Sequence, residues 1–142
     1  MSYEEKGVWV YLGAGVLTYA VYLTIVLRRA DGGPLTDVHY VPVLLWMLAV
    51  SVGFSVLGRI AFEVARPSES SAADVRDKEV RRFGEYVGGS LLSIAVVGVL
   101  VLAVLEVDHF WIANAIYLAF VLQAVVSSVA RLVAYRRGLV PW

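Results

Sequence analysis

Two histidines and several carboxylates lie on two short segments that separate apolar stretches of the chain. Asp37 and His39 belong to the first segment, and Glu106, Asp108 and His109 belong to the second. Imidazole and carboxylate groups bind divalent metals, and histidine also titrates near neutral pH. One hypothesis is therefore a weak metal or pH-sensing site formed by His39, Glu106, Asp108 and His109. The alternative is polar interfacial loops, because these are the only histidines and His-x-x-His spacing is absent.

A second set of polar side chains lies inside the last apolar stretch: Asn114, Tyr117, Gln123 and Ser128. On a helix, Asn114, Tyr117 and Ser128 share one face, whereas Gln123 lies well off it. Such residues either line the path of a small channel or form hydrogen bonds between helices. The position of Gln123 favours the second interpretation.

The most charged part of the chain, residues 72–85, precedes the third apolar stretch. Its candidate partner-binding residues are Asp74, Arg76, Asp77, Arg81 and Glu85. Opposite charges four residues apart, as in Asp74–Lys78 and Asp77–Arg81, stabilise a helix slightly. The segment is therefore either a solvated helix beside the membrane or a docking surface for a cytoplasmic protein.

Composition excludes several classes of protein. The chain has no cysteine, which removes disulfides and thiolate chemistry, and its 12 basic and 12 acidic residues give no net charge. A nucleic-acid binder would carry a basic excess, so we expect no direct nucleic-acid partner. No nucleophile–base pair or cofactor motif is visible, so we expect neither catalysis nor a cofactor. A lipid-modifying enzyme that uses the histidine cluster is the least favoured alternative.

Four apolar stretches position all of these residues. The chain has 142 residues, of which 60% are hydrophobic, and four segments run for about 20 residues with almost no charge. About 20 helical residues cross the hydrocarbon core of a bilayer. We therefore predict an all-α integral membrane four-helix bundle that forms a single domain over residues 1–142. The predicted spans are about 7–27, 40–60, 86–105 and 110–131, with a linker and juxtamembrane helix at 61–85.

The distribution of lysine and arginine predicts the orientation. Ten of the twelve basic residues lie in the N-terminal tail, the middle loop and the C-terminal tail, and only Arg28 and Arg29 lie on the opposite side. Because basic loops stay in the cytoplasm, we predict that both termini are cytoplasmic. Arg59 and Arg131, near the cytoplasmic ends of their helices, are expected to reach towards lipid headgroups.

Turn and breaker residues predict the connections. Asp31-Gly32-Gly33-Pro34 indicates a turn, and residues 106–109 leave room only for a tight turn between antiparallel neighbours. Ser68-Glu69-Ser70-Ser71 is typical of a flexible linker, and a helix that begins at Ala72 is expected to continue into the third span. Ser55–Arg59 and Ser127–Arg131 are similar, which indicates a faint repeat of two hairpins.

Small residues four apart predict close helix packing. Gly84 and Gly88 form such a pair, and so do Gly89 and Ser93. This spacing lets helix backbones approach one another, either within one chain or between copies. Four helices make a small bundle, so we expect a homo-oligomer surrounded by membrane lipids.

The segment Asp74-Val-Arg76-Asp77-Lys-Glu79-Val80-x-x-Phe-Gly84 resembles an uncharacterised family of small bacterial membrane proteins. Its members carry an acidic-x-Arg-Asp motif before a transmembrane helix, and residues 109–118 look like the actinobacterial members. The resemblance implies four helices in a bacterial inner (plasma) membrane. It also implies a regulatory setting, because such genes often lie beside a helix-turn-helix regulator.

These observations favour a non-enzymatic, oligomeric regulatory or scaffolding module that engages a cytoplasmic partner through residues 72–85. The alternative function is a small homo-oligomeric channel or passive transporter.

Overall fold

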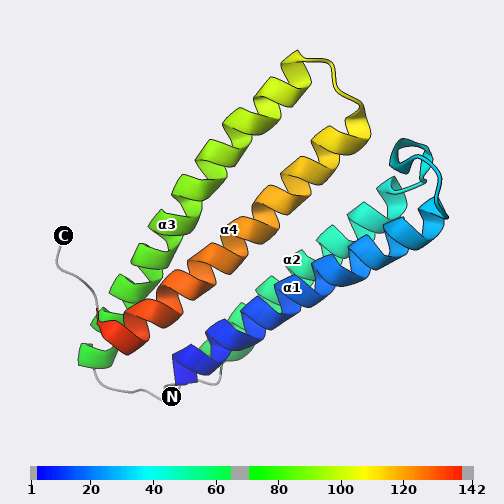
Figure 1. Ribbon diagram of the computed structural model, residues 1–142. Coiled ribbons are helices and arrows are strands. Elements are labelled where there is room, and N and C mark those ends of the chain that lie inside the picture. The colour runs from blue at the N-terminus through cyan, green and yellow to red at the C-terminus, as the bar shows by residue number, and fades with distance from the viewer. Residues whose placement is uncertain (1–2, 65–70, 139–142) are drawn as a thin grey trace.

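The computed structural model of the protein describes residues 3–64 and 71–138. It contains four α-helices and a short 3-10 helix: α1 (Tyr3–Ala30), η1 (Leu35–Asp37), α2 (Val41–Val64), α3 (Ser71–Val104) and α4 (His109–Arg137) (Figure 1). Each α-helix is long and apolar enough to cross a membrane, and the described residues contain no strand. The prediction of an all-α fold with four helices of membrane-spanning length and apolarity is therefore confirmed.

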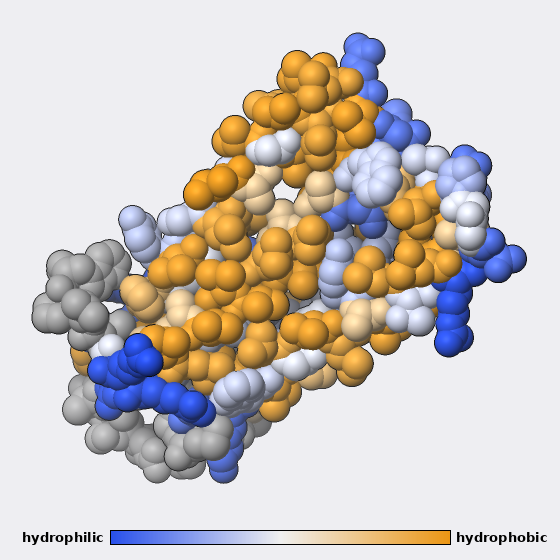
Figure 2. All heavy atoms as spheres, viewed as in Figure 1, coloured by the Kyte–Doolittle hydropathy of each residue, from blue (hydrophilic) through white to orange (hydrophobic). Residues whose placement is uncertain are grey.

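The helices run antiparallel, so the molecule has two distinct ends (Figure 1). The hairpin end carries the connections 31–40 and 105–108. The terminal end carries the start of α1, the end of α2, the start of α3 and the end of α4. Hydrophilic residues gather towards the two ends, and apolar residues cover the middle (Figure 2). This banding suits a protein that spans a bilayer.

The helices pack as a row rather than as a closed bundle. The most extensive contact joins α3 to α4, followed by α4 to α1 and α1 to α2. The outer members of the row, α2 and α3, expose large apolar side chains such as Trp46, Leu57, Ile94 and Val104. Such exposure is stable where lipid replaces water as the solvent.

The two connections at the hairpin end confirm the turn predictions. Asp31 and Gly32 end α1 with φ angles of 44° and 79°, and the Gly33 amide donates to the Ala30 carbonyl at 2.6 Å. Glycine enters this left-handed region without steric cost, and aspartate tolerates it better than most residues. After α3, Glu106 turns the chain with a φ of 53°, and the Val107 amide donates to Leu102 O. The sequence did not predict η1.

The third helix continues without a break from the charged segment into the span. Helix α3 has 34 residues and begins at Ser71, one residue before the predicted start. The predicted flexible linker lies outside the described residues, except for Ser71 itself. At about 1.5 Å per residue the helix is about 51 Å long, well over the ~30 Å of a hydrocarbon core.

Candidate functional site

The charged start of α3 lies against the end of α4. The Tyr135 hydroxyl donates to Asp77 Oδ1 at 3.1 Å, and Arg76 Nη2 donates to the Tyr135 carbonyl at 3.4 Å. Two of the predicted partner-binding residues therefore hold α3 to α4. Asp74 belongs to the same helix, but its side chain lies outside the described set.

Glu85 occupies a position between two arginines. Its Oε1 lies 3.9 Å from Arg81 Nε on α3 and 3.9 Å from Arg131 Nη2 on α4. The expected Asp77–Arg81 pair is not formed, because Asp77 turns to Tyr135 and Arg81 turns to Glu85. Glu85 thus links α3 to α4, and more than half of its side chain is exposed.

Gly84 and Gly88 bring the backbones of α3 and α4 together. A Cβ atom at Gly84 would lie 2.5 Å from Arg131 Cγ and 2.9 Å from Ser127 O. A Cβ atom at Gly88 would lie 2.9 Å from Ser127 Cβ and 3.0 Å from Gln123 O. Real Cβ atoms do not tolerate such distances, so this pair serves packing within one chain. A Cβ at Gly89, by contrast, would meet nothing within 4 Å.

Arg131 does not reach outward as the sequence suggested. Its stem lies over Gly84, and only 26% of its side chain is exposed. Its Nε is buried and has no hydrogen-bond partner among the described residues. The guanidinium is therefore anchored between two helices rather than extended to lipid headgroups. The side chain of Arg59 lies outside the described set.

An ion pair also joins α1 to α4 at the terminal end. Arg136 Nε lies 3.5 Å from Glu5 Oε1, and the Glu5 side chain is only 10% exposed. Glu5 and Tyr135 were not predicted as contact residues. Tyr135 follows Arg131 by four residues, so the two side chains share the face of α4 that contacts α3. This spacing is the sequence feature from which the contact of Tyr135 could have been predicted.

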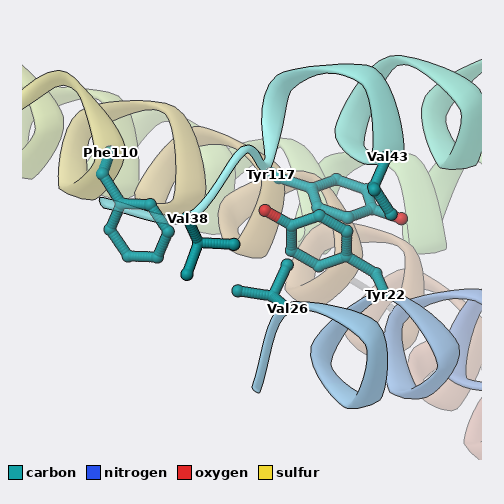
Figure 3. Packing of buried hydrophobic residues seen from close by; sticks show 6 residues of the cluster. All are labelled: Tyr22, Val26, Val38, Val43, Phe110 and Tyr117. Atoms are coloured by element: carbon teal, nitrogen blue, oxygen red, sulfur yellow. The ribbon is translucent and has the colours of Figure 1, made fainter. Parts of the chain in front are cut away.

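At the hairpin end, a polar bridge joins α1 to α4 inside an apolar core. Tyr22 is fully buried, and its hydroxyl donates to Asn114 Oδ1 at 2.7 Å. Asn114 Nδ2 donates in turn to the Phe110 carbonyl at 2.8 Å. Val26, Val38 and Val43 pack around this core together with Phe110 and Tyr117 (Figure 3). The Tyr22 partner was not predicted.

Three tyrosine rings surround this bridge. The Tyr117 ring meets those of Tyr19 and Tyr22 edge to face, with centroids 5.4 and 5.1 Å apart. Such geometry is favourable for aromatic pairs. The Tyr117 hydroxyl is buried and has no hydrogen-bond partner among the residues that the structure describes, and Ser51 of α2 lies beside it outside hydrogen-bond geometry. Tyr19, Tyr22 and Val26 share the spacing of one helical face, the sequence signal for this core.

The polar residues proposed to line a channel belong to different contacts. Asn114 and Tyr117 face α1, whereas Gln123 packs against Gly88 of α3. Ser128 is 2% exposed. These side chains therefore fill helix interfaces and do not line one continuous path through the described chain.

The histidines and carboxylates of the hairpin end do not assemble into a metal site. Asp108 caps α4 by accepting the Phe110 amide at 2.8 Å, and His109 is the first residue of that helix. His39 offers its backbone carbonyl to Arg29 Nη1 at 2.9 Å, and Glu106 is exposed in its turn. No group of three or more metal-ligating side chains occurs among the described residues. The four side chains of the metal hypothesis are therefore not gathered into such a group in this structure.

Comparison of the chain with protein families, with curated proteins and with solved structures finds no match. The resemblance to small actinobacterial membrane proteins stays a prediction.

Proposed function

We propose that the protein is a non-enzymatic membrane module that presents the start of α3 to a cytoplasmic protein. The observation that carries this proposal is the continuity of α3. About 20 of its 34 residues suffice to cross a bilayer, so about 14 extend beyond the membrane as one rigid helix. A rigid, pre-ordered surface lowers the entropy that binding would cost.

The proposed docking surface is the outer stripe of α3, formed by Val75, Glu79, Arg82 and Tyr86. These residues are exposed, and their spacing places them on one helical face. The opposite face carries Asp77 and the buried Val80 and is occupied by α4. The outer stripe replaces most of the partner-binding set expected from sequence, since Asp77 and Arg76 are engaged within the chain.

The chemistry of this stripe fits a protein partner. Arginine and tyrosine are the residues that most often dominate protein interfaces, and Val75 adds an apolar side chain that is 54% exposed. Glu79 and Arg82 supply charges of both signs, which favours a specific polar partner over a uniformly charged surface. A small soluble regulator is the class of partner implied by the family resemblance.

Orientation is part of the proposal. Ten basic residues belong to the terminal end and its segments, against Arg28 and Arg29 at the hairpin end. The positive-inside rule then puts the terminal end, both termini and the outer stripe in the cytoplasm of a bacterial cell. We further propose that copies associate through α2 and α3, which expose apolar side chains and open glycines such as Gly53 and Gly98. The two-hairpin repeat stays a prediction.

Site-specific photocrosslinking in native membranes tests the docking surface. A photoreactive amino acid is placed at Val75 or Glu79, and a matched probe is placed at Val97, an exposed residue in the span of the same helix. We expect one soluble protein to be captured at positions 75 and 79 and not at 97. Capture of no soluble protein at 75 and 79, or equal capture at all three positions, contradicts the proposal.

Charge reversal provides the second test. Arg82→Glu should abolish capture at position 79, whereas Arg137→Glu, at the exposed end of α4, should leave it unchanged. Both changes lower the charge of the terminal end by two units, so a loss of general electrostatic attraction would be equal in the two variants. An equal loss in both variants would therefore indicate nonspecific association.

A further inference from the structure

The outer stripe of α3 is narrow and straight. Its members Val75, Glu79, Arg82 and Tyr86 are separated by four, three and four residues. At 3.6 residues per turn they lie within about 60° of the helix circumference and extend for about 16 Å. All four are exposed, whereas Gly84, about 180° away on the same helix, is buried against α4. Alternation of three and four residues is the spacing with which one helix meets another.

The stripe has apolar ends and a charged centre. Val75 is 54% exposed and Tyr86 is 64% exposed, and Glu79 and Arg82 lie between them. Neither charged side chain forms an ion pair or a hydrogen bond with another residue that the structure describes. A complementary surface must therefore supply a base opposite Glu79, an acid opposite Arg82 and apolar contacts on both sides of this pair.

A helix fits the stripe better than a strand or an extended peptide. Extended segments are bound mainly through backbone hydrogen bonds to a sheet edge. The backbone groups in the middle of α3 are already paired within the helix, so only side chains are available for recognition. A ridge of side chains on one helix fits into the groove between the ridges of another.

The order of the charges favours a helix that runs antiparallel to α3. Glu79 precedes Arg82 in α3, so an antiparallel helix passes Arg82 first and carries its own acid N-terminal to its base. That order is also the favourable one within a helix, because it agrees with the direction of the helix dipole. A parallel partner would need the base before the acid, which is the less favourable order.

A second copy in the same membrane does not match this pattern. Copies inserted in the same direction have parallel α3 helices, and a symmetric contact along the stripe would place each Glu79 against Glu79 and each Arg82 against Arg82. Like charges that face each other across an interface oppose association. The charges therefore favour a different protein at this stripe.

We propose that the cytoplasmic partner binds the outer stripe through an amphipathic helix that runs antiparallel to α3. From its N-terminus, this helix places an apolar residue at Tyr86, then an acid at Arg82, then a base at Glu79 and finally a second apolar residue at Val75. The inference rests on the proposed docking function, and it adds the structure, direction and charge order of the partner segment.

Mapping of photocrosslinks in native membranes tests this helix. A photoreactive phenylalanine derivative replaces Val75 or Tyr86, so both charged members of the stripe stay in place. The captured protein is digested, and mass spectrometry locates the residue attached to each probe. We expect the position-86 site to lie N-terminal to the position-75 site by about 11 residues, the separation of the probes on α3. An extended segment would cover the same ~16 Å with about five residues.

The mapped sites separate this inference from the proposed function. Sites in the reverse order, sites about five residues apart, or sites in separate segments overturn the antiparallel helix and leave a docked protein. Attachment to a second copy of this chain also overturns it. Capture of no protein at either position overturns the docking surface and the helix together.

An exchange of charges tests the contact of Arg82. Because Arg82 is exposed, Arg82→Glu should leave the fold intact, which circular dichroism checks. It should reduce capture by a probe at Val75 at least about tenfold, since two acids then face each other. Replacing the partner's facing acid by arginine should restore capture to within about twofold of the wild type. The same replacement on the opposite face of the partner helix is the matched control. No restoration, or equal restoration by both replacements, overturns the proposal.

Discussion

The two sides of α4 meet their neighbours through different chemistry. Towards α3, glycines let the helices approach until the stem of Arg131 and the Ser127 carbonyl fill the space above Gly84. Towards α1, bulky rings hold the helices apart and one hydrogen bond joins Tyr22 to Asn114. The α3–α4 interface depends on the absence of side chains at the glycines, whereas the α1–α4 interface depends on the fit of large side chains. The first should therefore be the more sensitive to added volume, and the second to lost polar atoms.

The largest expected effect is the loss of the close α3–α4 contact in Gly84→Leu. A Cβ at this position already overlaps Arg131 and Ser127, so the helices must separate. We expect a loss of unfolding free energy of about 3 kcal/mol, at the upper end of overpacking costs. Denaturation by dodecyl sulfate in mild detergent, followed by circular dichroism, measures it.

Gly89→Leu is the matched control, because nothing lies within 4 Å of its Cβ position. We expect no loss of stability, since leucine is the better helix former. Equal destabilisation by both substitutions would show that glycine matters here for some reason other than the α3–α4 contact.

At the α1–α4 interface, the hydroxyls of Tyr22 and Tyr117 should differ in their contribution to the free energy of unfolding. Tyr22→Phe leaves Asn114 Oδ1 without its donor, and we expect a loss of about 1 kcal/mol, as for other hydrogen bonds between membrane helices. Tyr117→Phe removes a buried hydroxyl that has no hydrogen-bond partner within the described part of the chain, so stability should hold or rise. The same dodecyl sulfate titration compares them, and a larger loss in Tyr117→Phe would refute this account of the core.

A smaller effect is expected where the start of α3 meets α4. Tyr135→Phe removes the donor to Asp77 at a partly solvated position, and we expect a loss of about 0.5 kcal/mol. A double-mutant cycle with Asp77→Ala isolates this bond, because the second change should cost nothing once the first is made. Strict additivity of the two losses would mean that the pair does not interact.

The smallest effect is expected from Arg81→Gln. The Arg81–Glu85 pair is 3.9 Å long and more than half exposed on both sides, so solvent screens it. The change in unfolding free energy should lie within about 0.5 kcal/mol. A loss as large as that of Gly84→Leu would show that the charges, rather than the glycines, organise this interface.

Patterns over a few residues predicted much of this fold. The lengths of the apolar stretches predicted four helices long enough to span a membrane. Asp31-Gly32 predicted the first turn, and the spacing of Gly84 and Gly88 predicted a close helix contact. Each of these features is fixed by neighbouring residues, so a single sequence contains the relevant signal. The partner of the glycine pair was left open, because spacing alone does not tell a helix of the same chain from a second copy.

The candidate sites were less predictable because they depend on distant partners. Tyr22 and Asn114 are 92 residues apart, and Asp77 and Tyr135 are 58 apart. Asp77 has local partners of suitable charge, so sequence reasoning paired it with Arg81. Asp108 looked like a metal ligand because its capping role becomes evident only once α4 is seen to begin at His109.

The central place of α4 in the row has a consequence for biosynthesis. Ribosomes make the chain from its N-terminus, so α4 is synthesised after α1, α2 and α3. Helix α4 is nevertheless the neighbour with which both α1 and α3 make their most extensive contact. Until then Tyr22 has no Asn114 to bind, and Gly84 and Gly88 have no surface to approach. A chain that stopped before His109 would leave a hairpin and a separate helix in the membrane. The contacts among the four helices are thus completed only once α4 has been synthesised, and until then quality-control machinery can act on the unassembled spans.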